Sequence, residues 1–552
     1  LQKNFFSTKK KGASRVALFL QEKIDFSASR LSTSIWGFNA VSKSLFSSIF
    51  YFLISLFFFS QFTFAQEQKK PKIGLVLSGG GAKGFAHIGV LKVLEEAGIK
   101  IDYIGGTSMG AVVGGLYASG YNAAQIDSIF QATDFTKLIN DFIPRSSKNF
   151  YERRNEELYA IVLPFTNMKI GIPEALSKGM YNYNLLSRIT RNVRHIKDFN
   201  KLPIPFLCIG TNIETGKEGL LNKGNLAQAM IASSAFPSLF SPVEIDGEIL
   251  VDGGVVNNYP IEEVRKLGAD IIIGVDVQHD LLDRTQLKDA TKILIQITNL
   301  HSTERMKKNV SNTDIYIRPD ITQYSVISFD KGKEIITKGE EATFAVFEDL
   351  KKLVGESTPY KKPKLALISD SLEIKALKVN ALEDYTKEYV YGKLRFKPKS
   401  KITYDDFLKG INNINATQNF SAISYSFEPN NDGVNLDLNL KENSTRTYLK
   451  FGLHYDNLFK SGVLLNLTRK KALLKNDIAS LDVVLGDNIR YNLDYYIENG
   501  FNLSFGFKSH YIQFNRNIAS GISPTILNNL DINSINVDYS DQTNQLYFQS
   551  LF

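Results

Sequence analysis

The sequence predicts three folded units in series: an α/β domain with a largely parallel sheet and helices on both faces, a small α+β module, and the start of a transmembrane β-barrel. Three observations lead to this prediction. Short β-rich apolar runs alternate with helical patterns over residues 72–355. Strand and helix patterns are mixed over residues 370–442. After residue 446, nearly every segment alternates apolar and polar side chains at the period of a strand.

The composition is that of a globular chain. Of 552 residues, 43% are hydrophobic and 22% are charged, which excludes wholesale disorder and collagen-like structure. The 65 Lys and Arg against 57 Asp and Glu give a net charge of +8, but residues 1–65 hold eight basic residues and only two acidic ones. Because this segment carries +6 and the remainder about +2, the charge balance gives no support for nucleic-acid binding.

Residues 1–65 are predicted to be upstream sequence followed by a secretory signal peptide. Lys43 precedes an apolar run over residues 45–64, and Thr63 and Ala65 place small side chains before a cleavage point at Gln66. The alternative is a transmembrane anchor, but the apolar core is short for the about 20 residues that a span needs. The first Met is Met109 and the chain ends within a strand-like run, which predicts a fragment or a gene product with wrongly assigned ends.

The α/β domain, residues 72–355, is expected to contain buried parallel strands. One of them carries Cys208, the only cysteine of the chain, which excludes an intrachain disulfide and a cysteine-based zinc site. We predict that Cys208 is an inert buried thiol. The strands are expected at Lys72–Ser78, Ile101–Ile104, Ile204–Thr211 and Asp270–Gln278.

A glycine-rich loop follows the first of these strands and precedes a helix expected over Phe85–Ala97. It reads Gly79-Gly80-Gly81-Ala82-Lys83-Gly84. Glycines allow a tight turn with backbone amides directed into the loop, and the helix N-terminus adds partial positive charge. Such a loop holds a phosphate or a transient oxyanion equally well.

Two phosphate-binding interpretations can be tested against the sequence. A Walker A loop requires Lys and then Ser or Thr after its second glycine, whereas Phe85 and Ala86 follow Gly84. A dinucleotide-binding fold requires an acidic residue at the end of the next strand, whereas Asp102 lies at its start. Both observations weigh against a nucleotide site.

The second strand ends in Gly106-Thr107-Ser108-Met109-Gly110, directly before a helix expected over Ala111–Ser119. A G-x-S-x-G sequence in a strand-to-helix turn is a nucleophile elbow, in which Gly106 and Gly110 permit the strained turn and the serine hydroxyl projects at the carboxyl edge of the sheet. The sequence therefore predicts that Ser108 is a catalytic nucleophile.

A serine nucleophile needs a base. No histidine stands in an obvious catalytic loop; the six are His87, His195, His279, His301, His454 and His510. Asp252 ends a short strand and is followed by Gly253 and Gly254, which would let its carboxylate approach another backbone closely. Asp252 is therefore the predicted base, with a plain Asp-Gly hairpin turn as the alternative.

The three motifs, in this order, resemble the signatures of patatin-like phospholipases. The resemblance covers residues 72–270 and extends to Ala232–Pro237 and Asn257–Pro260, which flank the aspartate. It implies a Ser–Asp dyad without histidine that hydrolyses acyl esters of lipids, with Ser108 as nucleophile, Asp252 as proton acceptor and Gly253 and Gly254 as motif support. It also implies an oxyanion hole built from the loop Gly79, Gly80, Gly81, Ala82, Lys83 and Gly84. No cofactor is implied, and no calcium-loop pattern is visible.

Residues 356–369, rich in Pro and Lys, are expected to be a linker, and residues 370–442 a compact β-α-α-β-β unit that resembles a POTRA module. The last two strands are joined by a turn at residues 429–433. The expected strands are Ala376–Leu382, Phe420–Phe427 and Val434–Lys441, and the expected helices lie near Tyr385–Lys393 and Thr403–Asn415.

Residues 446–552 resemble the beginning of a BamA-like (surface antigen) outer-membrane barrel. Alternating segments of about ten residues with aromatic ends are the signature of such barrels, and a soluble β-sandwich is the alternative. Because an unclosed edge cannot face lipid, the segment is predicted to open a longer barrel. The expected strands are Tyr448–Tyr455, Val463–Thr468, Ile478–Leu485, Tyr491–Ile497, Asn502–Phe514 and Ile535–Ser540, with a further one beginning at Gln545.

These resemblances together imply an exported lipid acyl hydrolase in the outer membrane of a diderm bacterium, with the hydrolase domain periplasmic or at the cell surface. The implied partners are a phospholipid or other lipid-ester substrate, the outer membrane and, during insertion, the barrel-assembly machinery; no nucleic acid is implied. The alternative is an outer-membrane assembly or secretion module that carries a minor or inactive hydrolase domain.

Overall fold

The computed structural model describes residues 50–52, 70–278, 281–285, 287–288, 290–354, 360–362, 365, 369–498, 503–519 and 534–549. The chain divides into two compact units, Leu1–Lys70 and Pro71–Phe552, and the fold below belongs to the second. The predicted signal peptide lies outside the described residues except for the helical residues 50–52, as does most of the predicted linker. Among the described helices, none combines the length and apolar character needed to cross a bilayer.

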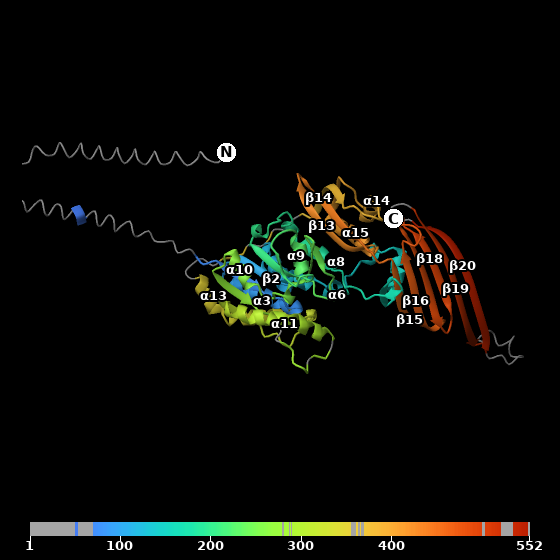
Figure 1. Cartoon of the computed structure of the whole chain (residues 1–552), viewed down its shortest axis with the longest axis horizontal. Helices are drawn as coiled ribbons and strands as arrows, with labels where there is room; N and C mark the ends of the chain where they lie inside the picture. Colours follow the sequence, from blue (N-terminus) through green and yellow to red (C-terminus); the bar gives the residue numbers. More distant parts are fainter. Residues whose placement is uncertain are drawn as a thin grey trace, which may run out of the picture. The chain divides into compact units, whose positions relative to one another are not determined.

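The α/β domain is built around an eight-stranded sheet (Figure 1). Five strands in the order β10-β9-β1-β2-β5 are parallel, and β8 and β7 extend the sheet beyond β5, which also pairs with β6. The strands are β1 (Ile73–Leu77), β2 (Tyr103–Thr107), β5 (Phe206–Asn212), β6 (Glu218–Leu221), β7 (Val243–Ile245), β8 (Glu248–Asp252), β9 (Ile271–Val275) and β10 (Ile315–Ile317).

The sheet is mixed, so the prediction of a largely parallel sheet holds only for its first five strands. β6 and β8 pair antiparallel with β5, and β7 pairs antiparallel with β8. Short connections explain the antiparallel pairs β5–β6 and β7–β8, because a turn of a few residues returns the chain antiparallel, whereas a parallel neighbour requires a long crossover. The sequence showed the apolar strands but not the short hairpins among them.

Helices cover both faces of this sheet, as predicted. On one face, α10 packs through Val264 against Val76 and Ile272. On the other face, α3 and α4 bury Leu75 and Leu77 in the main hydrophobic core. The helices of the domain are α3 (Ala86–Glu96), α4 (Met109–Ala118), α5 (Ala123–Ala132), α6 (Phe135–Ile139), α7 (Phe150–Leu158), α8 (Met180–Ile189), α9 (Leu226–Ser233), α10 (Ile261–Leu267), α11 (Ala290–Ser311), α12 (Gly332–Phe344) and α13 (Phe347–Val354).

The small module of residues 370–442 has a four-stranded sheet in the order β12-β11-β14-β13, with β11 and β14 parallel. The short edge strand β12 was not predicted; it pairs antiparallel with β11 and directly precedes α15. The elements are β11 (Ser371–Val379), α14 (Lys387–Leu394), β12 (Ser400–Thr403), α15 (Tyr404–Ala416), β13 (Phe420–Asn430) and β14 (Gly433–Glu442). The module packs on α8, where the Tyr183 hydroxyl donates to the Tyr425 carbonyl at 2.6 Å.

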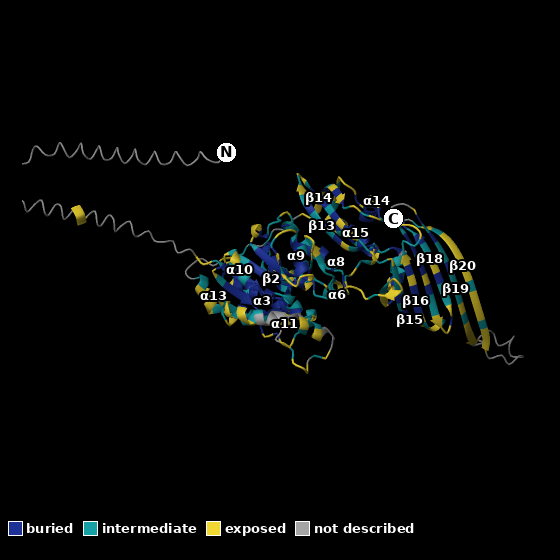
Figure 2. Ribbon diagram, in the orientation of Figure 1, coloured by how far each residue is buried: buried dark blue, intermediate teal, exposed yellow. Residues whose placement is uncertain are grey.

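The C-terminal segment forms one all-antiparallel sheet, as expected for part of a β-barrel (Figure 1). Its six strands are β15 (Thr447–Asp456), β16 (Lys460–Lys470), β17 (Asp477–Gly486), β18 (Arg490–Ile497), β19 (Ser504–Ala519) and β20 (Ser534–Gln549). The prediction of separate strands at residues 535–540 and from Gln545 onward was wrong, because β20 pairs with β19 without a break from Ser534 to Gln549. Figure 2 shows β20 exposed along most of its length.

Two strands of the α/β domain join the C-terminal sheet. β3 (Ile161–Thr166) pairs antiparallel with β15, and β4 (Lys169–Ile170) pairs with β3, so the order is β20-β19-β18-β17-β16-β15-β3-β4. The segment between α6 and α8 therefore leaves its own domain and extends the neighbouring sheet. Nothing in the sequence analysis predicted this exchange.

The faces of the C-terminal sheet are inverted relative to those of a soluble protein. The buried face is polar and includes Asn466, Thr468, Ser480, Asp482, Asn492 and Asp494. The opposite face is apolar and partly or largely exposed, and it includes Phe451, Leu453, Leu467, Leu481, Leu485 and Leu493. Polar-in and apolar-out alternation is the pattern of a transmembrane barrel, not of a soluble β-sandwich.

Candidate active site

The three predicted motifs meet at one edge of the α/β sheet. β1 and β2 are adjacent and parallel, so the glycine loop after β1 and Ser108 after β2 emerge side by side. β8 runs antiparallel to β5, with Asp252 opposite Gly210. A Cβ built on Gly79 would lie 2.8 Å from the Cβ of Ser108, so the loop approaches the serine as closely as a glycine allows.

Ser108 occupies a strained turn between β2 and α4. Its φ of 54° and ψ of −123° lie in a region that side-chain-bearing residues rarely adopt, as a nucleophile elbow requires. The Ser108 amide donates to the Ser233 hydroxyl at 3.0 Å, and the Ser108 hydroxyl donates to Oδ2 of Asp252 at 2.6 Å. The structure therefore brings the two predicted catalytic residues into direct contact, although 144 positions separate them in the chain.

Asp252 is almost fully buried at 5% exposure, and its carboxylate is held from both sides. Oδ1 accepts a hydrogen bond from the Gly254 amide at 2.7 Å, while Oδ2 faces Ser108. Burial raises the pKa of Asp252 to about 6, and the hydrogen bonds from Ser108 and Gly254 oppose that rise. A carboxylate with this pKa is ionised at neutral pH and accepts a proton more readily than an ordinary aspartate.

Some backbone amides of the glycine loop donate hydrogen bonds within the protein, and others are left to face the cavity. The Gly79 amide donates to Oδ1 of Asn258 at 3.0 Å, and the Ala82 amide donates to the Val326 carbonyl at 2.8 Å. The Lys83 amide donates to the Gly80 carbonyl, and Gly84 lies within the short 3-10 helix Gly81–Phe85. Within the described part of the chain, the amides of Gly80 and Gly81 have no such acceptor, and both residues line the cavity described below.

Cys208 and the described histidines are not part of this group of residues, and the side chains of His279 and His301 lie outside the described part of the structure. His87 is fully buried in α3, where Nε2 lies 2.8 Å from the Ser78 carbonyl, and burial lowers the pKa of His87 to about 4. No histidine is among the described residues that line the cavity. Cys208 is fully buried in β5, and burial raises its pKa, as expected of an inert core thiol.

A cavity of about 790 Å³ opens beside Ser108 and Asp252. Its volume is within the range of roughly 300–1,000 Å³ typical of small-molecule sites. Polar groups converge at one end, where Lys83, Ser108, Asp252 and Asn258 lie. The remaining wall is mainly apolar and includes Met109, Val112, Leu116, Ile129, Phe130, Phe135, Leu138, Ile139, Leu185, Leu186, Ile189, Leu239 and Phe240. The shape and lining suit a long hydrocarbon chain attached to a reactive polar group.

Two residues that position the site were not assigned a role by the sequence analysis. The Ser233 hydroxyl accepts a hydrogen bond from the Ser108 amide. The Asn258 side chain accepts a hydrogen bond from the Gly79 amide and donates one to the Gly79 carbonyl at 3.3 Å. Both lie in the stretches flanking Asp252, which were noted only as part of the family resemblance. A side chain that forms a hydrogen bond with the backbone of a residue far away in the sequence leaves no spacing pattern by which it could be predicted.

A polar cluster supports the turn that follows Asp252. The Asn257 side chain donates to Glu218 and Glu263 at 3.1 Å each, and Arg305 on α11 pairs with both carboxylates at 2.8 and 3.0 Å. The Thr107 hydroxyl donates to the Asn257 carbonyl at 2.9 Å, which ties the turn to the strand end that precedes Ser108.

The described residues contain no group of three or more His, Cys, Asp and Glu side chains suited to a metal ion.

Comparison with known families agrees with this geometry. The model of patatin-like phospholipases matches residues 75–265, which contain the glycine loop, Ser108 and Asp252. The chain carries a patatin-like phospholipase domain. The model of the OMP85 superfamily matches residues 434–552, so the inverted sheet belongs to an OMP85 superfamily domain.

Similar proteins match about half of this chain over a small part of their own length. The lysophospholipase NTE1 of Saccharomyces cerevisiae is 30% identical over 294 residues, which cover 48% of this chain and 16% of the relative. The lysophospholipase NTE1 of Scheffersomyces stipitis is 29% identical over 298 residues, which cover 48% of this chain and 17% of the relative. The chain thus spans about a sixth of the length of these relatives.

Solved structures with similarity to the chain include VipD of Legionella pneumophila and a BamA of Haemophilus ducreyi. VipD is 18% identical with a TM-score of 0.30, and the match covers 51% of this chain and 67% of VipD. The BamA structure, which lacks POTRA domains 1–3, is 12% identical with a TM-score of 0.22, and the match covers 31% of each chain.

Proposed function

We propose that this protein hydrolyses acyl esters of lipids with a Ser108–Asp252 dyad, as a phospholipase A or lysophospholipase, from a position in the outer membrane. The observation that carries the proposal is the 2.6 Å hydrogen bond from the Ser108 hydroxyl to the buried Asp252 carboxylate, at the polar end of an apolar cavity. The patatin-like domain and the relatives named lysophospholipase support the same chemistry.

In the first step, Ser108 Oγ attacks the ester carbonyl carbon while Asp252 Oδ2 accepts the hydroxyl proton. The carbonyl π bond becomes a tetrahedral oxyanion. Collapse of this intermediate re-forms the carbonyl, breaks the bond to the leaving alkoxide, and returns the proton from Asp252 to that oxygen. The products are an acyl ester on Ser108 and a free alcohol or lysolipid.

In the second step, Asp252 takes a proton from a water molecule that attacks the acyl-Ser108 carbonyl. The second tetrahedral intermediate expels the Ser108 oxygen, which recovers its proton from Asp252. The fatty acid leaves and the enzyme is regenerated. The cycle needs one carboxylate to act as base and then as acid in each half, and the pKa of about 6 suits both roles.

Gly80 and Gly81 are the best candidates for oxyanion donors. Their amides have no protein acceptor among the described residues and belong to the loop whose Gly79 nearly touches Ser108. Gly81 has a φ of +57°, and a Cβ there would lie 2.3 Å from the Val326 carbonyl oxygen, so only glycine gives this loop shape. One well-placed donor is worth roughly 3–4 kcal/mol in the transition state.

The membrane location is supported by the OMP85 superfamily domain and by its inverted faces. Carboxylates and amides lie on the covered face, while leucines and aromatic side chains lie on the uncovered face. Such a sheet suits a barrel wall in lipid, and its insertion would involve the barrel-assembly machinery. Export by the predicted signal peptide belongs to the same proposal.

The alternative, an assembly or secretion module with an inactive hydrolase domain, is weakened by the integrity of the site. A domain that had lost its chemistry would have no need for the strained backbone of Ser108 or a desolvated Asp252 in contact with it. A nucleotide-binding role is weakened by the apolar cavity wall.

The experiment compares fatty-acid release by the full chain with release by its Ser108→Ala and Asp252→Ala variants, on phospholipid, lysophospholipid and a short-chain ester. Loss of release in both variants, with circular dichroism unchanged, is the expected result. Full release by Ser108→Ala would refute the proposal.

A further inference from the structure

The segment between α6 and α8, residues 140–179, makes an excursion out of the patatin-like domain, and its residues 161–176 continue the apolar outer face of the OMP85 sheet. β3 pairs with β15 so that Leu163 lies opposite Leu449 and Ile161 opposite Phe451. Directly paired residues of neighbouring strands point to the same face, so Ile161 and Leu163 extend the apolar face by one strand. β4 extends it by another, because Ile170 lies opposite Phe165.

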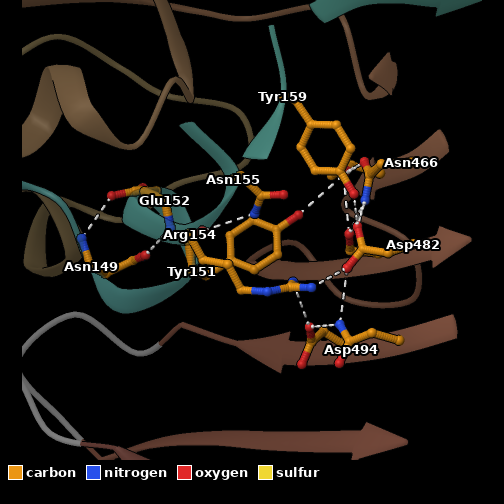
Figure 3. Close-up of polar contacts among 12 residues, drawn as sticks. Asn149, Tyr151, Glu152, Arg154, Asn155, Tyr159, Asn466, Asp482 and Asp494 are labelled. Atoms are coloured by element: carbon orange, nitrogen blue, oxygen red, sulfur yellow. Dashed lines mark hydrogen bonds and ion pairs between the residues drawn. The ribbon is translucent and has the colours of Figure 1, made fainter. Parts of the chain in front are cut away.

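The polar face of the same sheet holds this excursion in place (Figure 3). α7 lies over that face, and Arg154 pairs with Asp482 at 2.6 Å and with Asp494 at 3.3 Å. The Tyr159 hydroxyl donates to the Asp482 carboxylate, and the Tyr151 hydroxyl lies 3.1 Å from the Thr468 hydroxyl. The sheet carboxylates are buried, at 4% exposure for Asp482 and 8% for Asp494, so the arginine neutralises charges that water does not reach.

Beyond β4 the chain leads directly to the rim of the active-site cavity. The amides of Leu176 and Ser177 donate to the Ser238 and Leu239 carbonyls at 3.2 and 2.9 Å. Leu176, Ser238 and Leu239 all line the cavity that holds Ser108. The preceding end of the excursion also reaches the cavity, through Leu138 and Ile139 of α6.

The side chains along this route are apolar and exposed. Met168 is 86% exposed, Ile170 55%, Ile172 91% and Leu176 83%. Within residues 161–176 only Lys169 and Glu174 carry charge. A run of exposed large apolar side chains with so little charge marks a surface that contacts another apolar phase.

We propose that residues 161–176 form a lipid path: an apolar strip that contacts the bilayer holding the OMP85 sheet and delivers lipid from that bilayer to Ser108. The inference rests on the proposed function and adds the source of the substrate. A bilayer is the occupant that fits, because the strip begins with Ile161–Pro164, which pair in register with a strand whose own apolar face requires lipid. The enzyme therefore takes lipid from its own membrane, not from solution.

The test uses the full chain reconstituted in vesicles of phosphatidylethanolamine and phosphatidylglycerol. The variant Met168→Glu/Ile172→Glu places charge on the two most exposed positions of the path, and neither residue lines the cavity. The control variant Ile213→Glu/Leu220→Glu places the same two charges elsewhere on the patatin-like domain, where Ile213 is 54% and Leu220 48% exposed and neither lines the cavity. Each protein is assayed for release of fatty acid from the vesicle lipid and for hydrolysis of dissolved p-nitrophenyl butyrate.

The path variant should release vesicle fatty acid at least about tenfold more slowly, because two charged side chains on the strip oppose its contact with the apolar phase. Its hydrolysis of the dissolved ester should equal that of the wild type, which also shows that the site is folded. The control should match the wild type on both substrates. Equal loss on both substrates, or no loss on vesicles, would overturn the lipid path while leaving the dyad intact.

Two further outcomes are distinguishable. If the variant changes the oligomeric mass in detergent, the strip joins copies of the chain and does not serve as a lipid path. If the wild-type chain hydrolyses neither substrate, the proposed function fails, and the lipid path fails with it.

Discussion

Replacing Asp252 with asparagine separates the charge of this side chain from its shape. The amide oxygen of asparagine can still accept the Gly254 amide, and its NH₂ group can face Ser108, so the turn keeps its hydrogen bonds. What is lost is a group that accepts a proton. A positioned general base contributes roughly 10²–10⁴ to the rate, so we expect kcat/KM to fall by about that factor.

The pH profile gives a second signature of the same group. Because Asp252 must be ionised to accept a proton, kcat/KM of the wild type should rise with pH to a plateau, with its midpoint near pH 6. The residual activity of Asp252→Asn should lack that step. A variant profile with the step unchanged would assign it to another group.

The free energy of unfolding of the wild type should fall as pH rises, whereas kcat/KM rises. The folded state raises the pKa of Asp252 from 3.8 to about 6, so it holds the proton more tightly than the unfolded chain. Stability is therefore lost as pH rises from about 4 to about 6 and stays lower above that. The difference amounts to about 3 kcal/mol, so we expect Asp252→Asn to be more stable than the wild type at pH 8 by about 1–3 kcal/mol.

The assay is fatty-acid release together with thermal unfolding at pH 5 and pH 8. The expected combination is a protein with activity roughly 10²–10⁴-fold lower that unfolds at a higher temperature than the wild type at pH 8, with a smaller difference at pH 5. Near-wild-type activity would show that Asp252 is not the base. A variant that is less stable than the wild type at both pH values would show that burial of the Asp252 charge does not cost stability.

Three substitutions test the supports of the site and of the excursion. Gly110→Ala would place a Cβ 2.2 Å from the Leu77 carbonyl oxygen, so we expect a distorted elbow and loss of activity, measured as ester hydrolysis. Ser233→Ala leaves the Ser108 amide without its acceptor, so kcat should fall with KM little changed and stability should drop by about 1–3 kcal/mol. Arg154→Ala leaves two buried aspartates unpaired, which should destabilise the chain by roughly 3–5 kcal/mol; unchanged thermal unfolding would contradict the burial of that ion pair.

Local sequence patterns made the positions of the three motifs predictable. A glycine loop after a strand and a serine in a strand-to-helix turn both depend on neighbours in the sequence, and the structure has them where expected, with α4 starting at Met109. The contact between Ser108 and Asp252 is not local, and it was predicted through the family resemblance. The base assignment itself came from the Asp-Gly-Gly turn and the lack of a suitably placed histidine.

The missed features depend on distant pairing. β3 has only six residues, and its partner β15 lies almost 300 positions later, so no local pattern marks it as part of another sheet. β20 was predicted as two segments with the polar residues 541–544 left between them, whereas pairing with β19 continues the strand through those residues. Ser233 and Asn258 act through hydrogen bonds to distant backbone, which leave no periodic signal.

Covalent labelling tests directly whether Ser108 is the catalytic nucleophile. The full chain is treated with a long-chain alkyl fluorophosphonate, which phosphonylates an activated serine, and the modified peptide is mapped by mass spectrometry. If Ser108 is the nucleophile, we expect one adduct, on Ser108, with activity lost in proportion to labelling and no adduct in Ser108→Ala. An adduct on another serine that accompanies the loss of activity, or an unlabelled Ser108 in a protein that hydrolyses lipid, would contradict it.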